Sequence, residues 1–558
     1  MYRFLLLAFI TTSQFLIGQS KITRPKNVIL FIGDGFGIAP KTAARMAMGQ
    51  GTEGKRYYND AGFHVLELDK LKFTGMATTH SLNSWTTDSA PGATVYATGK
   101  KIDNEVISFD VTTNQPIETI LEQAKKQGYA VGLVTTTRIT HATPAAFGSH
   151  IWHRDLEDYI AAQLISKSQT EYEQVFNSSL IDSLKYSKER DWILPQPKVG
   201  VAIDVLLGGG AVNFMPDKYA DTLFDARRNF YVLNGKALLN TGKRKDNVNL
   251  VKIAQNRGYQ FVNTRDALLK IDLSKFKPGG KEKLLGLFKS SHLSYEQDRQ
   301  LSNSPEPTLA DMTQIAIEIL KRKGGKKGFF LMVEGGRIDH LAHANAGVST
   351  KACRFEVDSV AFPPDGGTER LKNTAQGNIY GSDYMIKEVL SFDYAIAEGR
   401  KLLPDKNSET LLFSTSDHEC GAVAVLGLYD STHKAMRTYA DEPTNLHQKW
   451  ATPNAIKRGD IATNGYFPEY IPYQFQGRIF PKPKSTNGRR IIITYASNPL
   501  TLGHNCESGY SFGNHTPQDI WVGSDDNVNG KFGSRIAGKG MLDNTYLNKI
   551  MADFLGLK

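Results

Sequence analysis

Continuous apolar runs alternate along this chain with segments whose apolar residues recur every three or four positions. The run at 27–33, NVILFIG, has the length and composition of a strand that is buried on both faces. Similar strands are predicted at 130–134, 201–207, 329–333, 410–415 and 520–523. Strands of this type that alternate with helices form a mainly parallel sheet with helices on both faces. The predicted fold class is therefore α/β.

Helices are predicted between these strands from apolar spacing and from the residues at their ends. The segment 117–127 carries one apolar face and follows Pro116, a residue favoured at the start of a helix. Thr308 and Asp311 are typical of an N-terminal cap, which predicts a helix that reaches Lys321. Two further helices are expected at about 383–401 and 542–554.

Two segments interrupt the alternation, at about 344–381 and about 425–510. The second is rich in tyrosine, phenylalanine and proline. A structureless loop of that length is uncommon in a compact domain, so we interpret this segment as an inserted subdomain over one end of the sheet. One catalytic domain over 20–558, with these two insertions, is the expected organisation.

The first 19 residues have the pattern of a signal peptide. Arg3 precedes a mostly apolar run at 4–17, and small residues follow it. The run is short for a membrane span, and no later stretch is long and apolar enough to cross a bilayer. We therefore expect a secreted or periplasmic protein with no membrane span after signal cleavage.

Composition and charge narrow the classes of partner. The chain has 40% hydrophobic and 22% charged residues, which suits a folded globular protein. A formal net charge of +10 could attract anionic substrates or an anionic cell envelope. The sequence contains no nucleic-acid-binding motif. Its three cysteines, Cys353, Cys420 and Cys506, allow at most one internal disulfide, so the fold does not depend on disulfides.

Ionisable residues follow several of the predicted strands directly. Asp34 comes after the first strand, Glu334 after the strand at 329–333, and Asp417 with His418 after the strand at 410–415. Ligands of open α/β sheets bind at the carboxyl ends of the strands. Acidic groups beside apolar strands are costly unless they are paired or bound to a metal. The pattern therefore favours a metal site at this edge.

Three further candidates are weak when each is taken alone. Asp339 and His343 are four residues apart, so a helix would place them on one face where they could chelate one ion, although a solvated pair is commoner. A lone histidine such as His515 is usually structural. Mixed Asp/His ligation suits zinc, and oxygen-only ligation suits magnesium.

Ser89 lies in the segment TTDSAPGATVYATG, where Pro91 and the small residues predict the start of a helix. A helix N-terminus presents free N–H groups and a positive dipole end, which favour an anion. An ordinary N-cap serine is the commoner reason to find Ser at such a position.

Six segments taken together resemble the alkaline phosphatase family. They occur in the family's order and are spread over nearly the whole chain. Their joint occurrence outweighs the ordinary explanations of the single residues. The segments are NVILFIGDG (27–35), TTDSAPGATVYATG (86–99), THATPAAF (140–147) with Arg154 following, VEGGRIDH–LAH (333–343), TSDHECGA (415–422) and NHTPQD (514–519).

The resemblance implies a site with two zinc ions and one magnesium ion. The implied ligands are Asp339, His343 and His515 for one zinc; Asp34, Asp417 and His418 for the other; and Asp34, Thr143 and Glu334 for magnesium.

The resemblance also implies the residues that act on the substrate. Ser89 would be the nucleophile that becomes phosphorylated, and Arg154 would hold the phosphate. Asp88, His141 and His340 would lie beside the substrate or the metal ligands. His141 and His340 stand where the best-known bacterial members have Asp and Lys, whereas the animal enzymes carry His at both positions. The change could weaken magnesium binding or alter phosphate release.

The implied activity is the hydrolysis of small phosphate monoesters through a phosphoserine intermediate. A phosphodiesterase or sulfatase of the same superfamily is one alternative, but Arg154 favours a dianionic monoester, and Ala93 stands where the sulfatase signature needs Arg. A catalytically inactive binding protein is another alternative, although no implied ligand is missing. The aromatic insertion could serve as the surface of a homodimer, but a self-packed subdomain is the simpler explanation.

Overall fold

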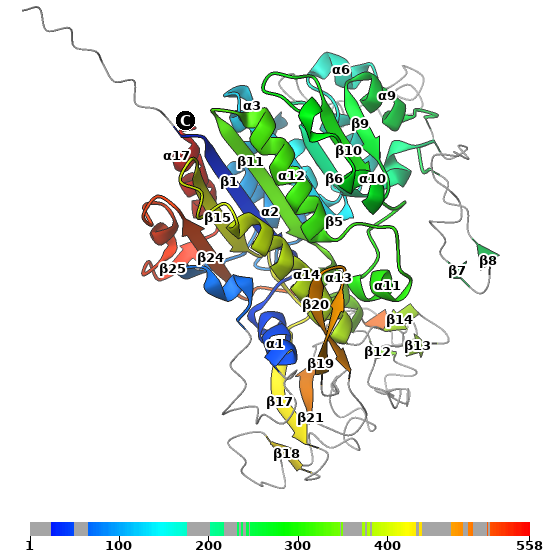
Figure 1. Ribbon diagram of the computed structural model, residues 1–558, viewed down its shortest axis with the longest axis vertical. Coiled ribbons are helices and arrows are strands. Elements are labelled where there is room, and N and C mark those ends of the chain that lie inside the picture. The colour runs from blue at the N-terminus through cyan, green and yellow to red at the C-terminus, as the bar shows by residue number, and fades with distance from the viewer. Residues whose placement is uncertain are drawn as a thin grey trace, which may run out of the picture.

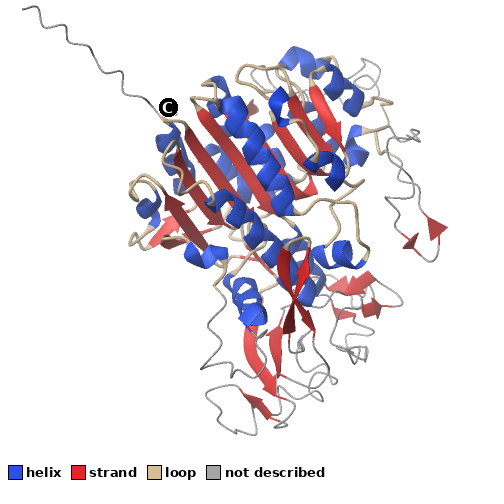
Figure 2. Cartoon of the chain, viewed as in Figure 1, coloured by secondary structure: helices blue, strands red, loops and turns tan. Residues whose placement is uncertain are grey.

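The fold was analysed in a computed structural model of the 558-residue chain (Figures 1 and 2). The structure describes residues 24–49, 65–175, 201–216, 242–345 except 245, 382–430, 470–483, 489–494 and 514–557, together with short pieces at 232–233, 236–237, 348–349, 371–373, 377–379, 435–437 and 510–511.

A ten-stranded sheet forms the centre of the molecule, as the alternating pattern predicted. Nine of its strands run parallel to a neighbouring strand, and β24 runs antiparallel to the strands on both sides of it. The order across the sheet is β25 (Met541–Asp543), β2 (Phe73–Thr78), β24 (Ile520–Asp526), β15 (Glu409–Thr415), β1 (Lys26–Gly33), β11 (Gly328–Gly335), β5 (Ala130–Arg138), β6 (Val205–Gly209), β10 (Lys283–Leu287) and β9 (Tyr259–Val262).

Strand β1 lies inside the sheet and has an apolar core on each face. Its alternate residues Val28, Leu30 and Ile32 belong to one core, and Ile29 and Phe31 belong to the other. All five are fully buried, which explains why the sequence of this strand is continuously apolar. The first core is covered by α2 (Ser89–Thr98), α3 (Ile120–Lys126), α4 (Ala142–Gly148) and α17 (Thr545–Leu555), and the second by α1 (Ile38–Gly49), α12 (Leu309–Gly324), α13 (Arg337–Asn345) and α14 (Ser382–Arg400).

The helix predicted to reach Lys321 forms as α12 and has the expected cap. The hydroxyl oxygen of Thr308 accepts a hydrogen bond from the Asp311 N–H, and the Asp311 carboxylate accepts one from the Thr308 N–H. The helix continues three residues beyond the prediction, to Gly324.

Several predicted boundaries were wrong. The helix expected to begin at residue 117 begins at Ile120, because Thr119 is its N-cap and Pro116 pairs in the short strand β4 (Gln115–Pro116). The strand predicted at 201–207 begins at Val205. The last helix begins at Thr545, since the residues before it form the edge strand β25.

The two predicted insertions lie mainly outside the described residues, and their organisation stays a prediction. The described strands of the second include the hairpin β19 (Tyr470–Phe475) and β20 (Arg478–Pro483). β17 (Ala424–Asp430) pairs antiparallel with β18 (Ala435–Arg437) and β21 (Arg489–Thr494). Figure 1 shows these strands beyond one end of the main sheet, near α1.

Three sequence predictions concern the ends and the cysteines. The predicted signal peptide at 1–19 lies outside the described residues, as do Cys353 and Cys506. Cys420 is buried and forms no disulfide. Among the helices that the structure describes, none is both long and apolar enough to cross a membrane.

Candidate metal centre

The predicted ligands converge at the carboxyl ends of three adjacent strands. Strands β15, β1 and β11 are in register, with Ile32 opposite both Glu334 and Thr415. Asp34 therefore leaves the sheet at nearly the same level as the residues that follow its neighbours. The side chains of Asp34, Glu334, Asp417 and His418 are fully buried there.

The first ligand group combines one carboxylate with two imidazoles. Asp339 and His343 lie on one face of α13, with 3.3 Å between Asp339 Oδ2 and His343 Nε2. His515 Nε2 lies 3.0 Å from His343 Nε2 and 3.5 Å from Asp339 Oδ1. Four tetrahedral ligands at zinc bond lengths lie about 3.3 Å apart, so these separations suit one zinc ion.

Strand pairing brings His515 into this group and adds Cys420 to it. The short strands β16 (Glu419–Cys420) and β23 (His515–Thr516) are antiparallel, with Cys420 opposite His515. The Cys420 sulfur, Asp339, His343 and His515 offer ligand atoms that all lie within 4.8 Å of one another. The sequence assigned no role to Cys420, because only the fold shows this pairing.

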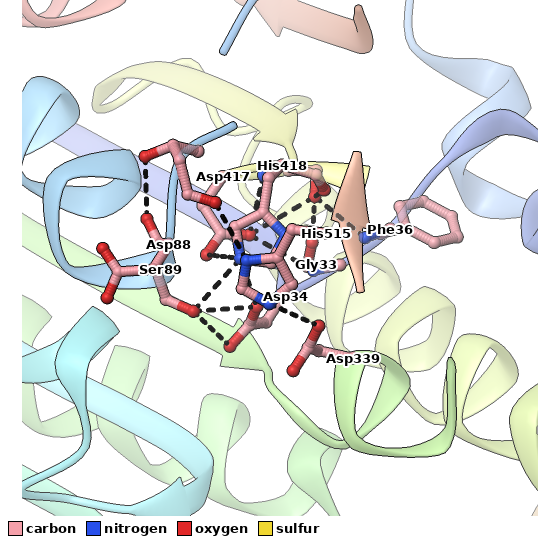
Figure 3. A network of polar contacts seen from close by, with 12 residues as sticks. Gly33, Asp34, Phe36, Asp88, Ser89, Asp339, Asp417, His418 and His515 are labelled. Carbon is pink, nitrogen blue, oxygen red and sulfur yellow. Dashed lines mark hydrogen bonds and ion pairs between the residues drawn. The ribbon is translucent and has the colours of Figure 1, made fainter. Parts of the chain in front are cut away.

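The second group consists of Asp34, Asp417 and His418. His418 Nε2 lies 3.4 Å from Asp34 Oδ1 and 3.3 Å from Asp417 Oδ2. The Asp417 carboxylate also accepts hydrogen bonds from the backbone N–H groups of Gly35 and His418, which fix its orientation. Figure 3 shows Asp34, His418, His515 and Asp339 turned toward one another beside Ser89.

The third group lies on the other side of Asp34. Ligand atoms of Asp34, Glu334 and His141 fall within 4.8 Å of one another. One Glu334 oxygen accepts hydrogen bonds from the hydroxyls of Thr135 and Thr137. The other oxygen makes none, and the buried Thr143 hydroxyl likewise makes none.

Buried polar atoms without hydrogen bonds test whether metal ions fit these groups. Such orphaned atoms are costly in a folded protein unless a ligand satisfies them. They occur in each of the three groups, and their oxygen and nitrogen donors are those that zinc and magnesium use. The oxygens are Asp339 Oδ1, Asp417 Oδ2, Glu334 Oε1 and Thr143 Oγ1. His418 Nδ1 and His141 Nδ1 also make no hydrogen bond, but in His418 it is Nε2 that faces the other ligands, and in His141 Nε2 accepts from Arg154.

The electrostatics of the carboxylates support the same conclusion. Burial and the neighbouring Asp417, Asp339 and Glu334 raise the pKa of Asp34 well above its ordinary value. Burial raises the pKa of Glu334 to about 7 and, with the charge of Asp339, that of Asp417 to about 6. Acidic groups packed this closely repel one another when ionised. Cations between them would relieve the repulsion, so the residues fit a multinuclear metal site.

Ser89 is the first residue of α2, and its side chain points into this site. Its Oγ lies 3.4 Å from Asp34 Oδ1 and 3.2 Å from His418 Nε2. The helix approaches the second ligand group closely at Gly92, where an added Cβ would lie 3.1 Å from the Asp417 Cβ. Glycine at this position therefore lets the helix N-terminus reach the metal ligands.

Arg154 contacts Asp88, the residue that precedes this serine. Its Nη1 donates a hydrogen bond of 2.7 Å to Asp88 Oδ2, and its Nη2 donates one of 3.2 Å to His141 Nε2. Asp88 also accepts a hydrogen bond from the Glu105 N–H, so the carboxylate is held from two sides. The arginine is thus oriented by the residue that directly precedes Ser89.

His141 and His340 meet a third histidine that the sequence analysis missed. His292 lies with its ring centroid 5.3 Å from that of His141 and 4.4 Å from that of His340. It lies in no motif, and no signal in its neighbourhood distinguishes it. Arg337 also contacts His340, and it stands inside the recognised segment VEGGRIDH without having been singled out.

The fold and the three ligand groups define an α/β protein with a candidate multinuclear metal centre. The profile of the family described as alkaline phosphatase matches residues 25–359. The chain belongs to the alkaline phosphatase family, as the six segments predicted.

Individual relatives agree with this assignment. The chain is 32% identical over 415 residues to the repressible alkaline phosphatase of Saccharomyces cerevisiae, which covers 73% of this chain and 56% of the relative. It is 33% identical over 336 residues to the tissue-nonspecific alkaline phosphatase of Felis catus, which covers 57% of this chain and 55% of that protein. The chain thus spans little more than half the length of these curated relatives.

Solved structures show the same fold. Alkaline phosphatase from the Antarctic bacterium TAB5 matches with a TM-score of 0.54 at 19% identity, over 96% of this chain and 99% of the other. Thermus thermophilus alkaline phosphatase matches with a TM-score of 0.56 at 21% identity, over 99% and 96% respectively. One TAB5 variant is described with Mg bound in the M3 site.

Proposed function

We propose that this chain hydrolyses small phosphate monoesters through a covalent phosphoserine at Ser89. The observation that carries the proposal is the position of Ser89 Oγ, 3.2 Å from His418 Nε2 and 3.4 Å from Asp34 Oδ1, at the N-terminus of α2. A nucleophilic hydroxyl needs an activating neighbour, and here the neighbours belong to the second ligand group.

Two zinc ions and one magnesium ion are the proposed cofactors. Bound zinc would supply positive charge that lowers the pKa of the serine hydroxyl and stabilises the leaving oxygen. The ligand groups would hold the ions as follows: Asp339, His343 and His515 one zinc; Asp34, Asp417 and His418 the other; and Asp34, Glu334 and Thr143 the magnesium.

Residues of the chain itself would position the phosphate. Arg154, held by Asp88, presents a guanidinium that can bind two phosphate oxygens. The N-terminus of α2 adds free N–H groups and a positive dipole end. In the proposed reaction Ser89 Oγ attacks phosphorus as the bond to the alcohol oxygen breaks, and the alcohol leaves with a proton. Water then cleaves the phosphoserine and releases inorganic phosphate.

A phosphodiesterase or sulfatase remains the competing function. The charge of Arg154 favours a dianionic monoester over a singly charged diester, because the second negative charge would have a guanidinium beside it. An inactive binding protein would be expected to lack a ligand residue, whereas this sequence keeps a carboxylate, an imidazole or a hydroxyl at each predicted position.

The test compares hydrolysis of p-nitrophenyl phosphate and bis-p-nitrophenyl phosphate between pH 7 and 10, before and after chelation. We expect fast monoester cleavage that the chelator abolishes and that zinc with magnesium restores. Preferential diester cleavage would refute the monoesterase assignment, and no turnover of either compound would favour the binding protein.

A second experiment tests the nucleophile. Ser89→Ala should accumulate no phosphoprotein from labelled substrate under acid quench. Wild type and the control Ser302→Ala should both accumulate it, because Ser302 is the C-cap of α11 (Glu296–Leu301) and its hydroxyl only donates to the Asp298 carbonyl. Labelling of Ser89→Ala would contradict the assignment.

Export and assembly are separate proposals. The sequence of the first 19 residues supports an exported protein, either secreted or periplasmic. A homodimer is proposed from the aromatic content of the second insertion. Sedimentation of the mature protein, with N-terminal sequencing of exported material, would test both.

A further inference from the structure

Arg337 is a buried cation, and none of the carboxylates that the structure describes forms an ion pair with it. It is the first residue of α13 and only 9% exposed, and its guanidinium lies 3.8 Å from the ring centroid of Tyr295. Its Nη1 donates a hydrogen bond of 2.6 Å to His340 Nδ1, and its buried Nε makes none. Across the described residues, no acidic side chain forms an ion pair with it. A buried charge without an ion pair is costly, and an anionic ligand would offset that cost.

Two nearby arginines, unlike Arg337, form ion pairs with glutamates. Arg138 is paired with Glu157, and Arg299 with Glu296, in each case through two guanidinium nitrogens. Arg337 also acts on Glu388, whose pKa burial raises to about 8. Burial thus disfavours the charged form of Glu388, and no ion pair joins it to Arg337 among the described residues.

Three partly exposed histidines lie beside this arginine. The rings of His141, His292 and His340 have centroids 4.4 to 5.5 Å apart, and each remains partly open to solvent. Burial and the neighbouring arginines lower the pKa of all three well below the ordinary value. Because an arginine can only donate, the contacts from Arg154 to His141 Nε2 and from Arg337 to His340 Nδ1 place the ring N–H of each histidine on its other nitrogen.

The hydrogen bonds of these rings favour an anion over a fourth metal ion. Arg154 donates to Nε2 of His141, and Arg337 donates to Nδ1 of His340. Both nitrogens of His292 lie against N–H groups of Arg138, and the one that carries no proton can accept. The single lone pair of each ring is thus engaged by an arginine, and the charge of Arg337 repels a cation. The remaining N–H groups of His141 and His340 are suited to an oxyanion.

We propose that Arg337, His340 and His292 form a second phosphate-binding subsite next to the phosphate held by Arg154. His141 connects the two positions, because it accepts a hydrogen bond from Arg154 and its ring contacts both other histidines. The inference rests on the proposed function. The ligand is a phosphate oxyanion, either the second phosphoryl group of a substrate with two adjacent phosphates or free inorganic phosphate.

The test uses the metal-loaded enzyme and the variants Arg337→Met and Arg337→Lys. Arg535→Met, which removes an arginine paired with Asp553 at the surface, is the control. The ratio of kcat/KM for inorganic diphosphate to that for p-nitrophenyl phosphate reports the subsite. We expect Arg337→Met to lower this ratio by about tenfold or more, since it removes a charge-assisted contact to one substrate only. Arg337→Lys should restore part of it, and Arg535→Met should leave it unchanged.

Calorimetric titration with inorganic phosphate distinguishes the two sources of the anion. If the ligand is free phosphate, wild type binds two equivalents and Arg337→Met one, while the substrate ratio stays constant. The proposal is overturned if Arg337→Met changes neither the substrate ratio nor the number of phosphate equivalents bound. It is also overturned if the variant lowers kcat/KM equally for both substrates. A wild-type enzyme that cleaves no p-nitrophenyl phosphate would refute the proposed function, and phosphate stoichiometry would still test the subsite.

Discussion

Replacing Gly35 by alanine would perturb two ligand groups through one methyl group. Gly35 follows Asp34, and its φ of +65° lies in the left-handed region. Its N–H donates to Asp417 Oδ1. An added Cβ would lie 2.7 Å from both the Cα and the Oδ1 of Asp339. The contact atoms are a backbone carbon and a proposed zinc ligand, neither of which can rotate away.

Two effects of the Gly35→Ala substitution, backbone strain and steric overlap, set the expected losses of stability and of zinc affinity. The left-handed conformation costs a residue with a Cβ about 1–2 kcal/mol. Relief of the overlap needs a movement of about 0.7 Å, from 2.7 Å to the 3.4 Å at which ordinary contact begins. Metal sites tolerate deviations of only about 0.2 Å in ligand distance. We therefore expect Gly35→Ala to weaken zinc binding by about tenfold to a hundredfold, the range found when groups around metal ligands are altered.

The assay measures zinc affinity by competition with a chromophoric chelator, and stability by urea unfolding. Gly279→Ala is the matched control, because Gly279 has a φ of +69° and an added Cβ would meet no atom within 4 Å. Both variants should lose stability of about 1–2 kcal/mol from backbone strain, but only Gly35→Ala should lose zinc affinity. Wild-type affinity in Gly35→Ala, or an equal loss in Gly279→Ala, would refute the reasoning.

Three other predictions concern metal content, pH and helix capping. Chelation should lower the melting temperature by several degrees, because bound ions stabilise only the folded state; an unchanged value would contradict the metal assignment. Burial opposes both charges of the Glu122–His150 pair, yet their attraction lowers the pKa of Glu122 and raises that of His150. The His150 contribution is complete below pH 6.5 and is lost as pH rises through its folded pKa, whereas that of Glu122 is lost as pH falls below 4.5. Glu122→Gln should therefore destabilise more at pH 6 than at pH 9 in urea unfolding, and a pH-independent difference would rule this out. Thr308→Ala should cost about 1 kcal/mol through loss of the cap, and Thr308→Ser should recover most of it.

The interior strands could be predicted because burial on both faces leaves a continuous apolar run. Strands β1, β11 and β15 have this pattern, and all lie inside the sheet. Strand β2 is largely half-exposed, and its sequence FTGMAT mixes polar and small residues. Its pairing with β24 and β25 stabilises it, and the residues of those two strands lie more than 400 positions later in the sequence.

Six of the proposed metal ligands could be singled out because they follow predicted strands or share one helical face, whereas Thr143 and His515 depended on the family resemblance. Cys420 and His292 could not be singled out, since their neighbours come from distant parts of the chain, and Arg337 was not distinguished within its segment. Cys420 reaches the first ligand group only through its pairing with His515. His292 acquires its neighbours from the ends of other elements, and nothing in its local sequence records them.

The interior position of β1 has a consequence for the order in which the chain can fold. This strand is made early, but its neighbours β11 and β15 begin at Gly328 and Glu409. The Gly35–Asp417 hydrogen bond spans 382 positions. During synthesis β1 stays unpaired until its partner strands have been made. Such late pairing slows folding and leaves an apolar segment open to aggregation. Chaperone demand should accordingly be highest before residue 415 is available, and metal uptake can serve as a late marker that the whole chain has assembled.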